Sequence, residues 1–330
     1  MEKDFREFLD ENFGVHITDK LFDRDTLSLK KGFTETLYKG SLQENNKYVI
    51  DELVGINKIK TKEGIDSSTI NWAFDFPGWI GPLNFSKDNV KDILVIGMEP
   101  HIGEGFRTAQ VTYGLRETFE NEFCELGEYR SNRILWNNLK SLFSNESKYY
   151  MESDFKDNKI DREFLERIYI TDLSHFAVKG NANEIQNVLN WKEIREENAK
   201  KYISETIDLI KPKFIVSQGN EVANFIDNYF RDYCKKDEMK PDDFNIEKSP
   251  RYVNFPHFKS YEYKSNQFIH LKLPHLASGL TNGFWLPNTK NATEKNKIRT
   301  EKRDLKMKEI REKLKEFEIL TQKQNNYARN

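Results

Sequence analysis

The chain has 330 residues, of which 37% are hydrophobic, 32% are charged and 13% are aromatic, and its formal net charge is −2. A nearly neutral chain gives no global charge argument for nucleic acid or a membrane surface, so any nucleic-acid site must be a local patch. Two cysteines are too few for a disulfide framework, no Cys/His spacing indicates zinc, and no apolar run approaches membrane-spanning length. We therefore expect a cytoplasmic monomer that binds no metal and no other cofactor.

The first 85 residues are predicted to form an N-terminal extension that packs on the core. Four apolar residues near the start are spaced as on one face of a helix. These residues are Phe5, Phe8, Leu9 and Phe13. Pro-Gly and Gly-Pro turns interrupt residues 71–82, whose aromatic side chains are expected to hold a loop against the core.

Residues 92–115 contain the feature around which the other segments are organised. Residues 93–96 are all apolar and predict a buried strand, which ends at Gly97. Glu99 and His101 follow, so a carboxylate and an imidazole lie just beyond the carboxyl end of that strand. In open α/β sheets this edge holds the ligand crevice. The loop that follows is rich in glycine, which lets a backbone approach a ligand closely.

Three further strands are predicted, and two of them lead into polar side chains. Residues 169–172 end at Asp172, and residues 268–273 lead through a proline into His275. The third predicted strand, at residues 214–217, runs into a Gly-Asn turn. Helices are predicted at residues 131–143, 193–210 and 220–230.

Two segments near the C-terminus are strongly charged. Residues 235–262 contain three prolines and are expected to form an insertion or a long surface loop. Residues 291–330 are predicted to form a charged C-terminal helix and tail, with the helix at about residues 294–320. Its apolar stripe should dock on the domain or on a partner. The stripe consists of Ile310, Leu314, Phe317 and Leu320.

The alternation of strands and helices predicts an α/β fold. We expect a three-layer sandwich with a central, mostly parallel four-stranded sheet, formed by residues 86–290. No GxGxxG sequence opens a helix after the first strand, and no GK[ST] sequence follows any strand. These absences argue against dinucleotide and P-loop nucleotide sites and leave the polar strand ends as the candidate site.

The strand ends, in this order, resemble the motifs of the uracil-DNA glycosylase superfamily. Residues 97–100, Gly-Met-Glu-Pro, look like the family's Gly-x-Asp/Asn-Pro turn after the first strand. Residues 105–110, Gly-Phe-Arg-Thr-Ala-Gln, are similar to the single-strand-selective monofunctional branch, in which a base-stacking aromatic residue stands three positions before an Ala-Gln pair. Residues 169–172 stand where the family has a strand ending in a base-reading Asn. Residues 273–278, Leu-Pro-His-Leu-Ala-Ser, are similar to its His-Pro-Ser segment, and the resemblance covers about residues 90–285.

This resemblance implies a monofunctional DNA glycosylase, which hydrolyses the N-glycosidic bond of an extruded, damaged or modified base. The catalytic residues would be Glu99, which activates water, and His275, which donates a hydrogen bond to the leaving base. The base-binding residues would be Asp172, Phe106, Tyr113 and Met98, and the DNA-binding residues would be Arg107, Ser278 and Gly279. The expected partner is single- or double-stranded DNA.

The chain has Asp172 at the position where the family has Asn. An ionised carboxylate only accepts hydrogen bonds, whereas the amide of Asn also donates. We therefore hypothesise that Asp172 favours a base with an exocyclic amine, such as cytosine or a modified cytosine, over uracil. Removal of modified cytosines from foreign DNA would be antiviral defence, and removal of damaged bases would be DNA repair.

Other interpretations stay open at the level of the sequence. Glu99 and Asp172 are also suited to capping a helix, Phe106 to filling the core and His275 to a structural role. A non-catalytic nucleic-acid-binding protein that kept the fold is an alternative function, and a nucleoside hydrolase is a third. A metal site built from Glu99 and nearby histidines has no helical ligand spacing to support it.

Overall fold

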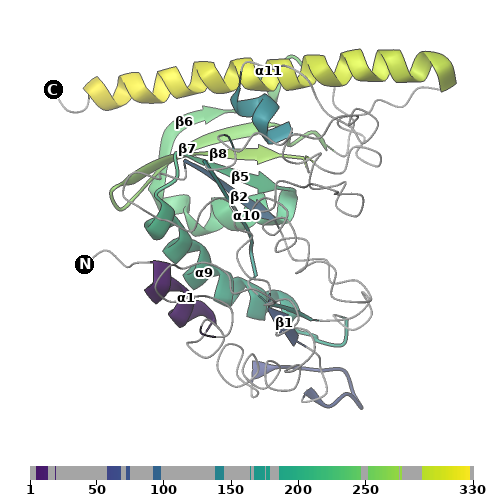
Figure 1. Cartoon of the computed structure of the whole chain (residues 1–330), viewed down its shortest axis with the longest axis vertical. Coiled ribbons are helices and arrows are strands. Elements are labelled where there is room, and N and C mark those ends of the chain that lie inside the picture. The colour runs from purple at the N-terminus through teal and green to yellow at the C-terminus, as the bar shows by residue number, and fades with distance from the viewer. Residues whose placement is uncertain are drawn as a thin grey trace. The chain divides into compact units, whose positions relative to one another are not determined.

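The computed structural model of the chain (Figure 1) describes residues 5–13, 19, 58–67, 72–74, 92–97, 138–144, 164, 167–174, 176–178, 186–246, 252–274, 276 and 292–327. Two compact units divide the chain. Residues 1–123 and 166–212 form the first unit, and residues 124–165 and 213–330 form the second. The fold is α/β, as predicted, and it contains both parallel and antiparallel strand pairs. The domain boundaries predicted at residues 85 and 290 stay predictions.

Two parallel strands of the first unit end side by side, and one of them ends at the predicted site residue Asp172. Strand β2 (Ile93–Gly97) pairs in parallel with β3 (Ile168–Asp172), and their last residues lie opposite each other. The apolar run that predicted β2 is completely buried. An ion pair supports the register at the other end of the strands, because Arg167 donates hydrogen bonds of 3.1 and 2.7 Å to the two carboxylate oxygens of Asp92.

Two helices of the first unit pack on each other and on β3. Helix α9 (Trp191–Ile210) begins two residues before its predicted start, and α1 (Phe5–Phe13) is the predicted N-terminal helix. The rings of Phe8 and Tyr202 are stacked with centroids 5.7 Å apart. The Tyr202 hydroxyl also lies 2.7 Å from the Thr171 hydroxyl. Tyr202 therefore connects α9 to both its neighbours.

An antiparallel pair, β1 with β4, completes the described strands of the first unit. Strand β1 (Trp72–Phe74) pairs with β4 (Phe176–Val178) over its whole length. The sequence pattern predicted a loop for residues 71–82, and this prediction is wrong for the three residues of β1. The turn signals Pro77-Gly78 and Gly81-Pro82 lie outside the described residues.

Four strands form the sheet of the second unit. Strand β5 (Phe214–Gln218) pairs in parallel with β8 (Asn266–Leu273), β8 pairs antiparallel with β7 (His257–Tyr263), and β7 pairs antiparallel with β6 (Cys234–Met239). The prediction of a long surface loop at residues 235–262 is therefore wrong where β6 and β7 lie, whereas the alternative that these residues form an insertion stays a prediction. The sequence of β6, CKKDEM, has too many charges to show a strand pattern. Charged side chains of this kind are typical of edge strands.

The two faces of this sheet differ in polarity. Side chains alternate along a strand, so His270 and Lys272 of β8 share one face and the apolar residues Ile269, Leu271 and Leu273 take the other. Helix α10 (Asn220–Tyr229) covers the polar face, where its Asp227 contacts His270. The same face therefore combines a helix, three strands and several titratable groups.

Helix α11 (Ala292–Tyr327), yellow in Figure 1, packs against the apolar face of the same sheet. The ring centroid of its Phe317 lies 6.2 Å from that of Phe258 in β7. The predicted apolar stripe is buried as far as Phe317, but Leu320 is 50% exposed. The docked stripe thus ends one turn earlier than predicted, and the helix docks within its own unit.

Residues 138–143 are helical and agree with the end of the helix predicted at residues 131–143. Leu139 and Leu142 are buried, and the ring centroid of Phe143 lies 5.0 Å from that of Phe214. This segment therefore packs on the first residue of β5. Among the helices that the structure describes, none is long and apolar enough to cross a membrane.

Candidate active site

The carboxyl ends of β2 and β3 bring Asp172 against Gly97. The two residues are register partners, and the N–H of Leu173 donates a 2.9 Å hydrogen bond to the Gly97 carbonyl. A Cβ atom added to Gly97 would overlap Oδ1 of Asp172 and would lie 3.2 Å from its Cγ. The φ angle of Gly97 is not positive. Glycine is therefore required here for the close approach of the carboxylate and not for an unusual backbone conformation.

The Asp172 carboxylate is positioned by a strand of the sheet. Asp172 is half-buried and belongs to β3, whose register with β2 is supported by the ion pair between Asp92 and Arg167. Sites built on strands are held more firmly than sites built on loops. The carboxylate can thus offer hydrogen-bond acceptors at a defined point beside the strand that leads into Glu99.

Replacement of Gly97 by alanine is expected to displace the Asp172 carboxylate. Overpacking of this kind should lower the free energy of unfolding by about 1–3 kcal/mol, which urea unfolding would measure. The control is the same change in an Asp172→Ala background, where the new methyl group meets no carboxylate. An equal loss of stability in both backgrounds would contradict the close contact.

In the second unit, hydrogen bonds hold the backbone on both sides of the predicted catalytic residue His275. Before it, the carbonyl of Leu273 accepts a 3.1 Å hydrogen bond from the N–H of Gly219. After it, the carbonyl of Leu276 accepts a 2.8 Å hydrogen bond from Nδ2 of Asn138. The residues that flank His275 are therefore tied to the end of β5 and to the helix at residues 138–143.

Asp172 belongs to the part of the chain that the structure describes, whereas the other predicted site residues lie outside it. Their roles in catalysis, base binding and DNA binding stay predictions. They are Glu99, His275, Phe106, Tyr113, Met98, Arg107, Ser278 and Gly279. The same holds for His101 and His175.

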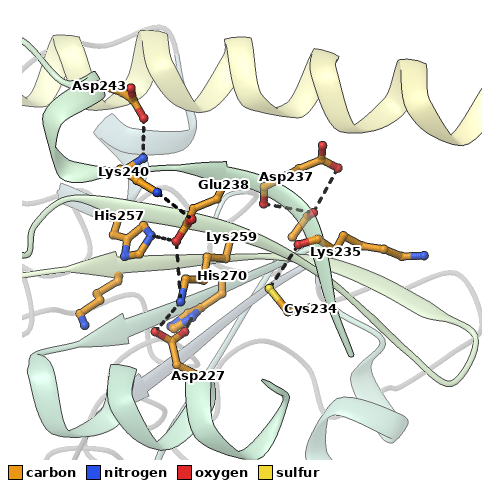
Figure 2. A network of polar contacts seen from close by, with 12 residues as sticks. Asp227, Cys234, Lys235, Asp237, Glu238, Lys240, Asp243, His257, Lys259 and His270 are labelled. Carbon is orange, nitrogen blue, oxygen red and sulfur yellow. Dashed lines mark hydrogen bonds and ion pairs between the residues drawn. The ribbon is translucent and has the colours of Figure 1, made fainter. Parts of the chain in front are cut away.

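A polar network that was not predicted connects α10 with β5, β7 and β8. Nε2 of His270 lies 2.8 Å from Oγ of Ser217. Nδ1 of His270 lies 3.1 Å from Oδ1 of Asp227, and Figure 2 shows these two residues with the part of the network that reaches Glu238. The hydroxyl of Tyr261 donates a 2.8 Å hydrogen bond to Oδ1 of Asp227, and Nζ of Lys259 donates a 3.1 Å hydrogen bond to Oδ2. One carboxylate therefore accepts hydrogen bonds from three side chains.

The protonation states in this network follow from burial and hydrogen bonding. Burial alone would raise the pKa of Asp227, but the hydrogen bond from His270 and the other nearby groups hold this pKa well below its usual range. Burial lowers the pKa of His270 more than Asp227 raises it, so the ring is neutral at pH 7. Because an ionised carboxylate only accepts hydrogen bonds, Nδ1 of His270 carries the proton and donates to Asp227, and Nε2 accepts a hydrogen bond from the Ser217 hydroxyl.

The order Ser217, His270, Asp227 matches the connectivity of a hydrolase triad, but its setting does not. Ser217 is 0% exposed and lies within the regular part of β5. A nucleophilic serine must reach its substrate, as it does from a sharp turn at the end of a strand. The geometry supports a structural role, in which the three residues hold α10 on the sheet.

A signal for this network is present in the sequence of β8. His270 and Lys272 are polar residues at alternate positions of the buried part of β8, residues 268–273, and such residues need buried partners. The sequence does not indicate which partners these are, because Ser217 and Asp227 lie on other elements. The signal therefore predicts a polar network but not its members.

The network extends to the rim of the sheet through Glu238. Oε1 of Glu238 lies 3.9 Å from Nζ of Lys259 and 2.7 Å from Nε2 of His257. Burial lowers the pKa of His257 more than its hydrogen bond with Glu238 raises it. Within the described ranges, no three or more His, Cys, Asp or Glu residues are grouped as metal ligands. The extension is therefore a chain of hydrogen bonds and ion pairs at the sheet rim.

Comparison with known protein families found no model that matches the sequence, and no curated protein matches it. The function of this chain must therefore follow from the side chains at the strand ends and from their chemistry. Among the predicted site residues, Asp172 is the one whose contacts the structure describes.

Proposed function

We propose that this protein is a monofunctional DNA base glycosylase that hydrolyses the N-glycosidic bond of an extruded base. The observation that carries the proposal is the carboxylate of Asp172, held against Gly97 at the carboxyl end of β2. Ligands of α/β proteins bind at this edge of the strands. Glu99 follows Gly97, the register partner of Asp172, by two residues in the sequence, which supports the proposal that the two carboxylates act in one site.

In the proposed reaction, the bond between C1′ of the sugar and the base nitrogen breaks, and the base leaves with the bonding electrons. The N–H of His275 donates a hydrogen bond that stabilises the negative charge on the base. Glu99 removes a proton from a water molecule, which adds to C1′, and its charge stabilises the cationic sugar. The proton ends on the departing base, and the products are a free base and an abasic site.

The remaining proposed roles concern the extruded nucleotide and the strand that carries it. Asp172 accepts a hydrogen bond from an exocyclic amine of the base, which favours cytosine or a modified cytosine over uracil. Phe106, with Tyr113 as the second candidate, stacks on the base, and Met98 lines its pocket. Arg107 and the main-chain N–H groups of Ser278 and Gly279 contact phosphates.

The proposal also includes the finer architecture and the setting of the reaction. We propose a three-layer sandwich whose central sheet has four parallel strands, which the parallel pairs β2–β3 and β5–β8 support, with β7 and β6 added to β8 as antiparallel strands. The protein would act as a cytoplasmic monomer on single- or double-stranded DNA, without a metal or other cofactor. DNA repair and antiviral defence are the two roles that such an activity would serve.

Replacement of Glu99 by glutamine tests the proposal. The substrates are single-stranded and duplex oligonucleotides that contain uracil, cytosine or a modified cytosine, and the readout is alkali-sensitive cleavage at the abasic site. Because glutamine cannot take a proton from water, base release should fall about 10²- to 10⁴-fold. The matched control is Glu197→Gln on α9, which removes an exposed ion pair with Lys58 and should leave the rate unchanged.

Three results would contradict the proposal. Binding of DNA without release of any base would favour the non-catalytic nucleic-acid-binding alternative. Release of bases from free nucleosides at the same rate as from oligonucleotides would favour a nucleoside hydrolase. An unchanged rate in the Glu99→Gln variant would remove Glu99 from the mechanism.

A further inference from the structure

Asn138 makes a hydrogen bond that links two distant segments of the second unit. Its Nδ2 donates to the carbonyl of Leu276 at 2.8 Å, and the two residues are 138 positions apart in the chain. Asn138 and Leu276 are both 0% exposed. A buried amide is unfavourable unless it is hydrogen-bonded, so this contact contributes to the preference for one arrangement of the segment that contains Leu276.

The hydrogen bond falls next to the proposed leaving-group donor, His275. On the other side of His275, the carbonyl of Leu273 accepts a hydrogen bond from the N–H of Gly219. The residue between Leu273 and His275 is Pro274, whose ring fixes its φ angle. The described residues before and after His275, Leu273 and Leu276, are therefore both held by hydrogen bonds of their carbonyl groups.

Asn138 also differs from its helical neighbours in what it contacts. Leu139 and Leu142 bury apolar side chains, and the ring of Phe143 packs on Phe214 of β5. A leucine at position 138 would fill a similar volume but could not donate to a carbonyl. The amide is thus suited to hold an irregular backbone segment, whereas packing alone would require only an apolar side chain.

We propose that Asn138 is a positioning residue, which holds the backbone after His275 so that the imidazole meets the leaving base at hydrogen-bond distance. This inference depends on the proposed function, because it assigns a catalytic purpose to the segment that Asn138 holds. Catalytic geometry is sensitive to small displacements, and a 1 Å misplacement can reduce a rate by about 10²-fold. Asn138 acts through the segment that carries His275 and contacts neither substrate nor base.

The test uses Asn138→Leu, which keeps the volume and removes the donor, and Asn138→Ser, which keeps a polar but shorter side chain. In single-turnover assays on the preferred oligonucleotide, the rate of base release should fall about 10- to 100-fold, with the affinity for DNA unchanged. The matched control is Thr206→Val on α9, because Thr206 is also 0% exposed and its hydroxyl donates to the carbonyl of Tyr202 within the same helix. Its rate should equal that of the wild type.

A double-mutant cycle separates positioning from a general loss of structure. In a His275→Ala background, Asn138→Ser should have no further effect on the rate, because no imidazole is left to position. A further 10- to 100-fold loss in that background would contradict the inference. So would an unchanged rate in a folded Asn138→Ser variant. If Asn138→Leu does not fold, the serine variant and its cycle decide the question.

Failure of this inference can be distinguished from failure of the proposed function. If Glu99→Gln and His275→Ala both reduce base release while the Asn138 variants do not, the glycosylase proposal stands and the positioning role is excluded. If neither of the two catalytic variants affects the rate, the proposed function itself is wrong.

Discussion

Replacement of Asp172 by asparagine is expected to change the preferred base from one with an exocyclic amine to uracil. The carboxylate accepts hydrogen bonds only, so it matches an amine but repels the O4 atom of uracil. An asparagine amide can donate to O4 and accept from N3–H of uracil. Because a site rejects a base that leaves its polar groups unpaired, the ratio of the two rates should change by at least about 10²-fold.

The measurement is the single-turnover rate of base release from oligonucleotides that differ only in the target base. The Asp172→Asn variant keeps the size of the side chain, so the contact with Gly97 is preserved. Asp232→Asn is the matched control, because Asp232 is an exposed residue of η6 (Arg231–Tyr233). Identical base preferences in the wild type and the Asp172→Asn variant would exclude base reading by Asp172.

Replacement of Asp227 by alanine is expected to lower the free energy of unfolding by about 3 kcal/mol. The variant removes the acceptor that Lys259, Tyr261 and His270 share, and it leaves Lys259 as a largely buried cation whose next carboxylate is 3.9 Å away. Urea unfolding would measure the loss. The exposed change Asp232→Ala should stay within about 0.5 kcal/mol of the wild type, and an equal effect of both changes would contradict the role of the network.

The same network predicts the direction in which stability depends on pH. Folding lowers the pKa of both Asp227 and His270, so the unfolded chain binds more protons in acid, and stability falls as pH falls. For His270 the loss begins as pH falls below its ordinary pKa of 6.5 and continues towards its lower folded pKa. For Asp227 the loss begins below the ordinary pKa of 3.8.

Measurement of the urea midpoint between about pH 7 and pH 5 isolates the histidine contribution, because the Asp227 contribution lies at lower pH. Ser217 from β5 and Lys259 from β7 face the His270 ring together with Asp227, and Lys272 lies beside it on β8. His270→Gln should make the decrease in midpoint less steep. His257, whose pKa is also lowered by burial, would contribute to the decrease that remains.

Much of the secondary structure could be predicted from local patterns. The apolar run of β2, the 3.6-residue period of α10 and the Lys-Pro end of α9 all lie within short segments of the chain. Each reflects a local cause, namely burial on both faces, burial on one face, or a backbone that cannot continue a helix. The positions of these elements were therefore predicted to within a few residues.

The candidate site could be predicted only in part, because local patterns do not determine how two strands align with each other. The sequence places Asp172 at the end of a strand, and the position next to Gly97 follows from the register of β2 with β3. Register is a property of two strands and is supported by Asp92 and Arg167 at their far ends. The close approach of the Asp172 carboxylate to Gly97 therefore depends on tertiary structure, although each residue can be recognised in its own sequence motif.

The sequence by itself determined the α/β class, the four strands β2, β3, β5 and β8, the α-helices that the structure describes, and the chemistry available at the strand ends, because burial and periodicity act over neighbouring residues. The hydrophobic pattern of the charged segment CKKDEM does not predict a strand. The tertiary structure alone decided that this segment is a strand, because pairing with β7 holds it in the sheet. It also decided that Ser217, Asp227 and His270 meet. These residues lie on β5, α10 and β8, and their contact depends on strand register and on the helix that covers one face of the sheet.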